Sequence, residues 1–389
     1  MLRLDKFTVK IVILAHALKA GGGVSVGQNF VAALKRRLPA SQFWVTVPDG
    51  LGYEGFIGDE RCGFTPFLQQ NYRQQWYFEN ITLPGLVREQ NPDVIISLAN
   101  RALPRAPCPQ LMLLHDAHLF YPRRFYAGES LKRKILKALQ GIKLGRDLPQ
   151  LSALLVQTAT AEQRVRRKYG FTSEVVQIPN AISKKVAENI EFDEPSIYRG
   201  HRNVARLFYL TRYYPHKNIE LIVEAFERFP ERLQDCRVFL TIAADQHPGA
   251  RKLLQRIVDA GLEQRIINIG PLRQEELGAY FQHSDALLMP TTLESFSGTY
   301  LEAMAFKTPI LTSQLDFAEE ICADAALYFK PWEAESLCQA IETLIQKPEL
   351  ARNLSKNGLT RLEALQWNWD DNAQRVAEVI EEIVQAPDL

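Results

Sequence analysis

The stretch Glu294-Ser-Phe-Ser-Gly-Thr-Tyr-Leu-Glu302 joins a predicted strand to a predicted helix. The strand is the apolar run at 286–289, and Pro290 ends it because proline cannot donate a hydrogen bond to a neighbouring strand. The serines, glycine and threonine of the stretch are residue types that begin helices, and we expect the helix to run to about 305. A strand that passes into a helix is the repeating element of a parallel α/β sheet.

The start of this helix is predicted to bind phosphate. Backbone N–H groups at Ser297, Gly298 and Thr299 would face a ligand there, together with the positive end of the helix dipole. Glu294 precedes the helix, and Glu302 lies about one turn inside it. Carboxylates accept hydrogen bonds well from sugar hydroxyls, so we expect one to reach a group beyond the phosphates and the other a group beside them.

Two cations follow another predicted strand, at 205–210. Arg212 lies just past that strand, and Lys217 lies at the start of the next helix. Arginine suits a bidentate contact with a phosphate and lysine a point contact, so the pair could neutralise a diphosphate without a metal ion. The chain contains no Asp-x-Asp triplet, and we therefore expect no metal. The alternative is that these are ordinary surface cations and that the two glutamates share their spacing by chance.

The same alternation of strands and helices extends over most of the chain. It predicts an α/β fold with two Rossmann-like domains, each with a mostly parallel, doubly wound sheet, and a cleft between their strand ends. Predicted helices include 24–38, 131–144, 159–169 and 218–229. The remaining predicted strands lie at 9–15, 43–47, 94–98, 111–114, 153–156, 175–178, 238–242, 266–269, 310–312 and 326–329.

A charged, weakly apolar segment interrupts the alternation and sets the expected domain boundaries. We expect an N-terminal acceptor domain at 1–183, a linker at 184–200 and a C-terminal nucleotide-sugar domain at 201–366. Residues 367–389 hold a final helix at about 371–384, after the aromatic pair Trp367 and Trp369.

The bulk composition excludes several classes of function. The 389 residues carry a net charge of +1, so no overall field favours nucleic acid. The five cysteines are odd in number and have no metal-ligand spacing, which indicates a reducing compartment. The N-terminus lacks the apolar core of a signal peptide. The simplest expectation is a cytoplasmic protein.

The first predicted domain offers two further candidate positions. Gly22 and Gly23 lie in a glycine run that opens a helix, where backbone amides can approach a phosphate or a sugar. The run does not satisfy G-x-G-x-x-G because position 26 is Val, so we expect no NAD site. His115 follows the strand at 111–114 and could exchange a hydrogen bond with a sugar hydroxyl; the alternative is a structural role at the strand end. We rank Asp116, His118 and His16 below His115.

A basic amphipathic helix is predicted at 131–146. Six lysines and arginines lie among its leucines and isoleucines. We favour a domain helix with a solvated basic face; the alternative is contact with an anionic membrane, which would favour a lipid-linked acceptor.

Taken in order, the motifs make the chain resemble the retaining glycosyltransferases of family 4 (glycosyl transferases group 1), which have the two-domain GT-B architecture. The resemblance covers most of the chain and is strongest from 207 to about 341. The landmarks that carry it are Gly22-Gly23, His115-Asp116, Ile178-Pro-Asn180, Arg212 with Lys217, Ile269-Gly-Pro-Leu272, Glu294 to Glu302, and Ala303-Met-Ala305.

The resemblance implies a hexosyltransferase that uses a UDP- or GDP-linked sugar, retains anomeric configuration and needs no metal or cofactor. The acceptor would be a carbohydrate or a lipid-linked molecule, and contact with the inner face of the membrane through 131–146 would follow from the latter. The final helix would return to the first domain. Glu294 would hold hydroxyls of the donor sugar, and Glu302 would hold the ribose. Arg212 and Lys217 would bind the diphosphate together with backbone amides at 297–299, and Leu272 would contact the base through its main chain. His115 would contact the sugar near the reacting carbon, and Gly22 and Gly23 would let the first domain close on the donor.

The chain departs from the family pattern at several positions. Ser297-Gly298-Thr299 stands where Gly-Leu-Pro is frequent, Lys307 where glycine is frequent, and Ala243-Ala-Asp245 where Gly-x-Gly is expected. If position 307 has a positive φ, Lys307 is strained. Two other functions remain open, a GT-B epimerase or phosphorylase and a non-catalytic scaffold of the same fold.

Overall fold

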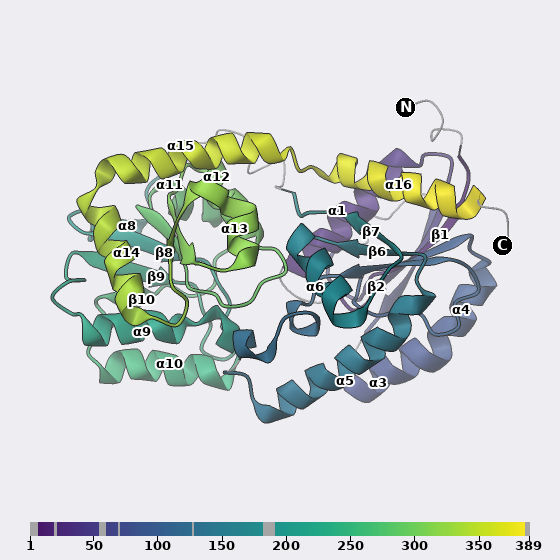
Figure 1. Cartoon of the computed structure of the whole chain (residues 1–389), viewed down its shortest axis with the longest axis horizontal. Helices are drawn as coiled ribbons and strands as arrows, with labels where there is room; N and C mark the ends of the chain where they lie inside the picture. Colours follow the sequence, from purple (N-terminus) through teal and green to yellow (C-terminus); the bar gives the residue numbers. More distant parts are fainter. Residues whose placement is uncertain are drawn as a thin grey trace. The chain divides into compact units, whose positions relative to one another are not determined.

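The computed structural model describes residues 7–18, 22–53, 60–68, 71–126, 128–181 and 191–385. The chain divides into two compact units (Figure 1). Unit 1 comprises Met1–Phe120, Ile135–Ala181 and Trp367–Leu389, and unit 2 comprises Tyr121–Lys134 and Ile182–Gln366.

Unit 1 is built on a parallel sheet with the strand order β3-β2-β1-β4-β5-β6-β7. Its apolar strands form two buried layers, because alternate side chains of β1 face opposite sides of the sheet. Its strands are β1 (Lys10–Leu14), β2 (Gln42–Pro48), β3 (Cys62–Phe67), β4 (Val94–Ser97), β5 (Gln110–Leu114), β6 (Ala153–Val156) and β7 (Glu174–Gln177). Its helices are α1 (Gly22–Arg37), α3 (Tyr72–Tyr77), the π-helix η2 (Phe78–Thr82), α4 (Leu83–Gln90), α5 (Leu131–Asp147), α6 (Ala159–Tyr169) and α16 (Trp369–Gln385), and the first residues of α5 belong to unit 2.

Unit 2 has a parallel sheet with the order β10-β9-β8-β11-β12-β13. Its strands are β8 (Ala205–Tyr209), β9 (Cys236–Leu240), β10 (Ile266–Asn268), β11 (Ala286–Met289), β12 (Ile310–Ser313) and β13 (Ala326–Phe329). Its helices are α8 (Ser196–Arg199), α9 (Ile219–Arg228), α10 (Pro248–Asp259), α11 (Leu277–Gln282), α12 (Gly298–Ala305), α13 (Asp316–Cys322), α14 (Ala334–Gln346) and α15 (Pro348–Leu365).

The predicted fold class is confirmed, since both sheets are parallel and helices cover both faces of each (Figure 1). In each sheet the strand order reverses beside the first strand: β1 lies next to β4 in unit 1, and β8 lies next to β11 in unit 2. Ligands of such sheets bind beyond the carboxyl ends of the strands at this switch point. The switch points therefore direct the search for a site to residues after β1 and β4, and after β8 and β11.

Three segments differ from the expected organisation. Strand β3 was not predicted, because Gly63 and Pro66 weaken the strand pattern; an edge strand tolerates both. Residues 191–200 of the expected linker belong to unit 2, where Tyr198 is fully buried and its hydroxyl lies 2.8 Å from that of Ser284. The segment Tyr121–Lys134, expected in the first domain, groups with unit 2, where the Tyr121 hydroxyl bonds Asp316 at 3.0 Å.

Helix α16 packs within unit 1 against α1 (Figure 1). Its buried face contributes Val376 and Ile380 to the core of that unit, and the Asn372 amide bonds the Pro179 carbonyl at 2.7 Å. Residues that precede and follow unit 2 in the sequence thus belong to unit 1.

Candidate functional site

The candidate site lies at the switch point of unit 2. The segment with Arg212 and Lys217 follows β8, and the segment from Glu294 to Glu302 follows β11. These strands are hydrogen-bonded neighbours, with Ala286 opposite Leu207. Their carboxyl ends therefore bring together two segments that are about 80 residues apart in the sequence.

Hydrogen bonds fix the turn after β8 to the loop after β11. The His216 carbonyl accepts a hydrogen bond from the Thr292 N–H at 2.8 Å, and the side-chain amide of Asn218 donates one to the Pro290 carbonyl at 3.3 Å. Asn218 has φ +53°, a left-handed conformation that asparagine tolerates better than most residues. The buried Tyr209 hydroxyl donates to the Lys217 carbonyl at 2.7 Å. These contacts hold Lys217 in a defined position.

Lys217 forms an ion pair with Glu294. The ammonium bonds Glu294 Oε1, and the Thr291 hydroxyl donates to the same oxygen at 3.1 Å. Both charged side chains are largely buried, with 17% of Lys217 and 13% of Glu294 exposed. A pair this sheltered from water is screened less than a surface pair and aligns both groups.

Helix α12 begins at Gly298 as predicted, with Ser297 in an extended conformation as the N-cap. Ser297 thus occupies the expected N-cap position, but its side chain makes no capping hydrogen bond to the helix. A Cβ built on Gly298 would meet no described atom within 4 Å. The described residues therefore leave room beside Gly298 at the start of the helix, where the first backbone N–H groups lack intrahelical partners and can bind an anion.

Glu302 lies one turn inside α12 and is half-buried. Its carboxyl makes no hydrogen bond or ion pair with any residue that the structure describes, and burial raises its pKa to about 7. An acid kept from water without a charged partner is partly protonated at neutral pH. It is placed to bind a polar group at the helix start.

Arg212 is exposed, and its guanidinium has no hydrogen bond or ion pair within the described parts of the chain. Leu272 follows β10 and is half-buried, after Gly270 with φ +79°. The end of β9 separates β10 from β8, so Leu272 lies two strands away from Arg212. Lys307, just beyond α12, has φ +59°, which confirms the strain expected there.

In unit 1, His115 follows β5 and is half-buried. The backbone N–H groups of His115 and Asp116 both donate to Asn100 Oδ1, at 2.7 and 2.9 Å, and position the turn. Burial lowers the pKa of His115 despite the nearby Asp116, so its ring is neutral at pH 7. A neutral imidazole can donate or accept a hydrogen bond.

Asp116 has a structural role. Burial disfavours its ionised form, but hydrogen bonds and charges from His118 and Lys137 outweigh that cost and lower its pKa. The His118 ring lies 3.0 Å from one carboxylate oxygen, and the Lys137 ammonium bonds the other. The carboxylate thus joins the turn after β5 to α5, which supports its lower rank.

Gly22 and Gly23 are the first residues of α1. A Cβ on Gly22 would meet no described atom within 4 Å, and one on Gly23 would meet Leu18 at an ordinary 3.6 Å. Gly21 lies outside the described residues. Packing against the described residues of unit 1 therefore does not require glycine at Gly22 or Gly23.

The sequence did not predict one polar cluster in unit 1, although His16, which belongs to it, was a lower-ranked candidate. His16 follows β1 and is buried, with Nδ1 2.9 Å from the Thr46 hydroxyl and Nε2 3.6 Å from Glu79. Burial opposes the charge of Glu79, yet His16 and Arg101 outweigh it and lower the Glu79 pKa to about 2. No sequence signal could have placed Glu79 here, because it comes from the π-helix η2.

The basic helix predicted at 131–146 is α5, and its orientation was not foreseen. Two of its cations turn inward: Arg133 lies 3.3 Å from Glu129, and Lys137 bonds Asp116. The inward side of α5 carries the small residues Gly141 and Gly145, which pack closely against Tyr169. Cβ atoms built on these glycines would lie 3.3 and 3.4 Å from that side chain. The exposed residues span an arc of roughly 140° and are Leu131, Lys132, Ile135, Leu136, Leu139, Ile142, Lys143 and Arg146. This differs from a helix that only solvates a basic face.

None of the helices that the structure describes has the length and apolarity needed to cross a membrane. All five cysteines are free thiols.

Comparisons with known proteins agree with this geometry. The glycosyl transferases group 1 family matches residues 199–361, which include the whole candidate site of unit 2. The O-antigen chain mannosyltransferase RfbU of Salmonella typhimurium is 23% identical over 62% of this chain and 62% of its own length. The chain therefore aligns with less than two thirds of that relative.

Solved structures share the fold over nearly the full chain. Sucrose-phosphate synthase from Thermosynechococcus elongatus has a TM-score of 0.74 at 18% identity and covers 97% of this chain and 100% of its own. The Anabaena protein Alr3699/HepE in complex with UDP-glucose has a TM-score of 0.71 at 16% identity, over 96% and 100% of the two chains. The two units have the GT-B fold, and residues 199–361, within unit 2, match the glycosyl transferases group 1 family.

Proposed function

We propose that this protein is a glycosyltransferase that moves a hexose from a UDP- or GDP-linked donor to a carbohydrate or lipid-linked acceptor. The observation that carries the proposal is the Lys217–Glu294 pair beside the start of α12, at the switch point of unit 2. It places a cation, a carboxylate and free helix amides next to one another, which are the groups that a nucleotide sugar needs. The relative that is named as a mannosyltransferase and the fold neighbour solved with UDP-glucose support a sugar donor of this class.

The diphosphate would bind at the start of α12. Gly298 and Thr299, with Ser297 before them, offer backbone N–H groups and the positive end of the helix dipole. Lys217 and the exposed Arg212 add two positive charges at the same edge. Charge neutralisation by these cations stabilises the leaving diphosphate, so we propose that the reaction proceeds without a metal ion.

The two glutamates would bind opposite ends of the donor. Glu294, held by Lys217 and Thr291, accepts hydrogen bonds from hydroxyls of the sugar, and Glu302 accepts them from the ribose. The main chain around Leu272, after the left-handed Gly270, would contact the base. In unit 1, the neutral His115 would bond the donor sugar, and Gly22 and Gly23 would let the backbone approach it.

We propose that transfer retains the anomeric configuration. The bond between the anomeric carbon and the diphosphate oxygen breaks, and the acceptor oxygen forms its bond on the same face of the sugar. The departing phosphate oxygen takes the proton of the acceptor hydroxyl. Arg212 and Lys217 stabilise the negative charge that remains on the diphosphate.

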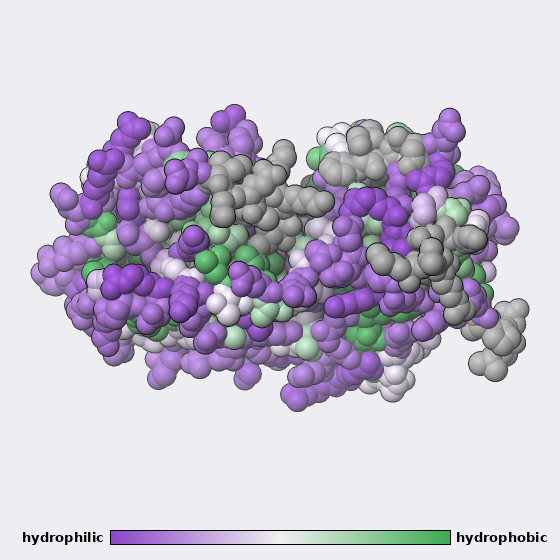
Figure 2. Space-filling model, turned by 90° about the horizontal axis from the view of Figure 1, so that it is seen from above, coloured by the Kyte–Doolittle hydropathy of each residue, from purple (hydrophilic) through white to green (hydrophobic). Residues whose placement is uncertain are grey.

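We also propose that the protein is cytoplasmic and contacts the inner face of the membrane through α5. The helix exposes five large apolar side chains, from Leu131 to Ile142, together with Lys132, Lys143 and Arg146. Soluble proteins rarely expose such a continuous patch, and cations beside it favour an anionic lipid surface. By contrast, the described residues visible from above in Figure 2 are mainly hydrophilic.

A panel of UDP- and GDP-linked sugars tests the function, scored by thermal shift and by nucleotide release with candidate acceptors. One donor should stabilise the protein and be consumed. The substitution Glu294→Gln keeps the size of the side chain and its bond from Thr291 but removes the charge. It should lower kcat/KM by on the order of a hundredfold, because a hydrogen bond to a charged group contributes about 1.5–3 kcal/mol. A fully active variant with an unchanged melting temperature refutes the assigned role.

A further inference from the structure

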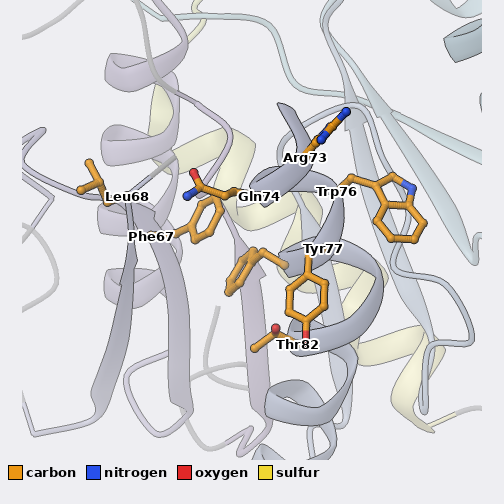
Figure 3. A pocket seen from close by; sticks show the side chains of 8 residues that line it. Phe67, Leu68, Arg73, Gln74, Trp76, Tyr77 and Thr82 are labelled. Carbon is orange, nitrogen blue, oxygen red and sulfur yellow. The ribbon is translucent and has the colours of Figure 1, made fainter. Parts of the chain in front are cut away.

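An apolar groove lies at the carboxyl end of β3 in unit 1. Its volume is about 750 Å³, within the range of sites that hold small organic ligands. Figure 3 shows Phe67 and Leu68 at the end of β3 on one side and Trp76 and Tyr77 of α3 on the other, and Phe78 of η2 completes the apolar wall. Among the described residues that line the groove, Arg73 is the one with a charged side chain.

The apolar residues that line the groove are unusually open to water. Leu68, Trp76 and Tyr77 are 61%, 53% and 58% exposed. Large side chains exposed together mark a surface that is covered in function. Tryptophan and tyrosine combine an apolar ring with a polar tip, which suits a boundary between hydrocarbon and water.

The inner end of the groove leads to the switch point of unit 1. Phe67 stacks on Phe78 with ring centroids 4.0 Å apart. Both rings contact the His16 ring edge-on, at 5.9 and 5.1 Å. His16 follows β1, which adjoins β4 at the position where such sheets bind ligands. A molecule in the groove would therefore contact two rings that pack directly against His16.

The groove adjoins the proposed membrane face. Lys143 of α5 lines the same small cavity, of about 30 Å³, as Glu79 and Asn80 of η2. Ile81 of η2 is 54% exposed, and the exposed fractions of the large apolar residues on the outer side of α5 lie between 38% and 74%. Helix α5 therefore lies beside η2, and Thr82 of η2 lines the groove. The exposed apolar residues of both elements, together with Lys143 and Arg73, complement a hydrocarbon chain with an anionic headgroup.

We propose that the groove binds the hydrocarbon chain of a lipid acceptor with an anionic headgroup, which enters from the bilayer that α5 contacts. This inference rests on the proposed function, since it names the class of acceptor. Trp76 and Leu68 contact the chain, and Arg73 lies near the headgroup.

The test uses the full chain and dodecyl phosphate below its micellar concentration, followed by titration calorimetry. Saturable binding of one molecule per chain is expected for the wild type. Trp76→Ala should weaken it by about tenfold or more, the scale for removing a central aromatic contact, with little change in melting temperature because Trp76 is half exposed. Trp332→Ala is the matched control, since Trp332 is 48% exposed in unit 2; it should bind as the wild type does.

Several results would overturn the proposal. These are no saturable binding, inorganic phosphate that binds as tightly as dodecyl phosphate, or an equal loss in Trp332→Ala. A concentration-dependent dimer that Trp76→Ala abolishes would show that the groove binds a second copy instead. Affinity for UDP and GDP, measured in the same variants, separates this proposal from the function: Trp76→Ala should leave nucleotide affinity unchanged. Dodecyl phosphate binding without any nucleotide binding would refute the proposed glycosyltransferase function, but it would still show that the groove binds a hydrocarbon chain with an anionic headgroup.

Discussion

Lys217 bonds Glu294 although the two residues lie 77 positions apart in the sequence. The pair connects the turn after β8 to the loop after β11, and it is largely buried. Neither side chain needs the other to hold the fold, because two other hydrogen bonds already join the segments: the Thr292 N–H donates to the His216 carbonyl, and the Asn218 side-chain amide donates to the Pro290 carbonyl. The pair therefore presents a cation and a carboxylate together at a strand edge, where a donor can use both.

Lys217→Ala should weaken binding of the nucleoside diphosphate by on the order of 1.5–3 kcal/mol, the contribution of a hydrogen bond to a charged group. Titration calorimetry with UDP and GDP measures the change. Lys330→Ala is a suitable control, because Lys330 is also a lysine of unit 2, with 68% of its side chain exposed. Equal affinity of Lys217→Ala and the wild type would exclude a phosphate contact for Lys217.

Glu302 should make stability depend on pH. Burial raises its pKa from 4.5 to about 7 in the folded protein. Between these values the folded state binds more protons than the unfolded state, so stability falls as pH rises through this window. Glu302→Gln removes the effect: relative to the variant, the wild type should lose on the order of 2 kcal/mol between pH 4 and pH 8.

Urea unfolding of both proteins at several pH values measures this difference. Glu263→Gln serves as the control, since Glu263 is exposed in unit 2. Parallel pH profiles of the wild type and Glu302→Gln would show that burial does not perturb this carboxyl.

Two glycines of α1 should respond in opposite ways to alanine. A Cβ on Gly27 would lie 2.3 Å from the hydroxyl of the buried Tyr53, so Gly27→Ala should destabilise the protein by about 1–3 kcal/mol. A Cβ on Gly22 would meet no described atom within 4 Å, and Gly22→Ala should keep the melting temperature but lower transfer if the donor approaches this backbone closely. Thermal unfolding and nucleotide release separate the two effects. Normal transfer by Gly22→Ala would remove the glycine from the donor site.

The sequence predicted the elements whose signals are local. Pro290 and the polar residues before Gly298 located the end of β11 and the start of α12. Every predicted strand occurs in the structure, and the structure adds one strand that was not predicted, β3. Gly63 and Pro66 obscured β3, and an edge position tolerates them because only one side of the strand is paired. The positions of these elements therefore followed from local sequence spacing.

Contacts between distant segments could not be predicted in the same way. Nothing local pairs Lys217 with Glu294 or brings Glu79 to His16, because each pair depends on strand order. The orientation of α5 was also hidden, since its pattern fits either an apolar or a small-residue face turned inward. The small-residue face turns inward because Gly141 packs against the side chain of Tyr169.

This orientation of α5 gives the last prediction. The protein should sediment with vesicles made of equal amounts of phosphatidylcholine and phosphatidylglycerol, and much less with phosphatidylcholine alone, because each cation near an anionic surface contributes about 1 kcal/mol. Ile135→Ser combined with Leu139→Ser should reduce sedimentation through loss of apolar contact, and Lys132→Glu combined with Arg146→Glu should reduce it through charge. Val258→Ser changes an equally exposed apolar residue of α10, at 51% exposure, and should sediment as the wild type does. If all of these proteins bind both kinds of vesicle equally, α5 does not contact the membrane, and its exposed leucines and isoleucines must be covered by another partner.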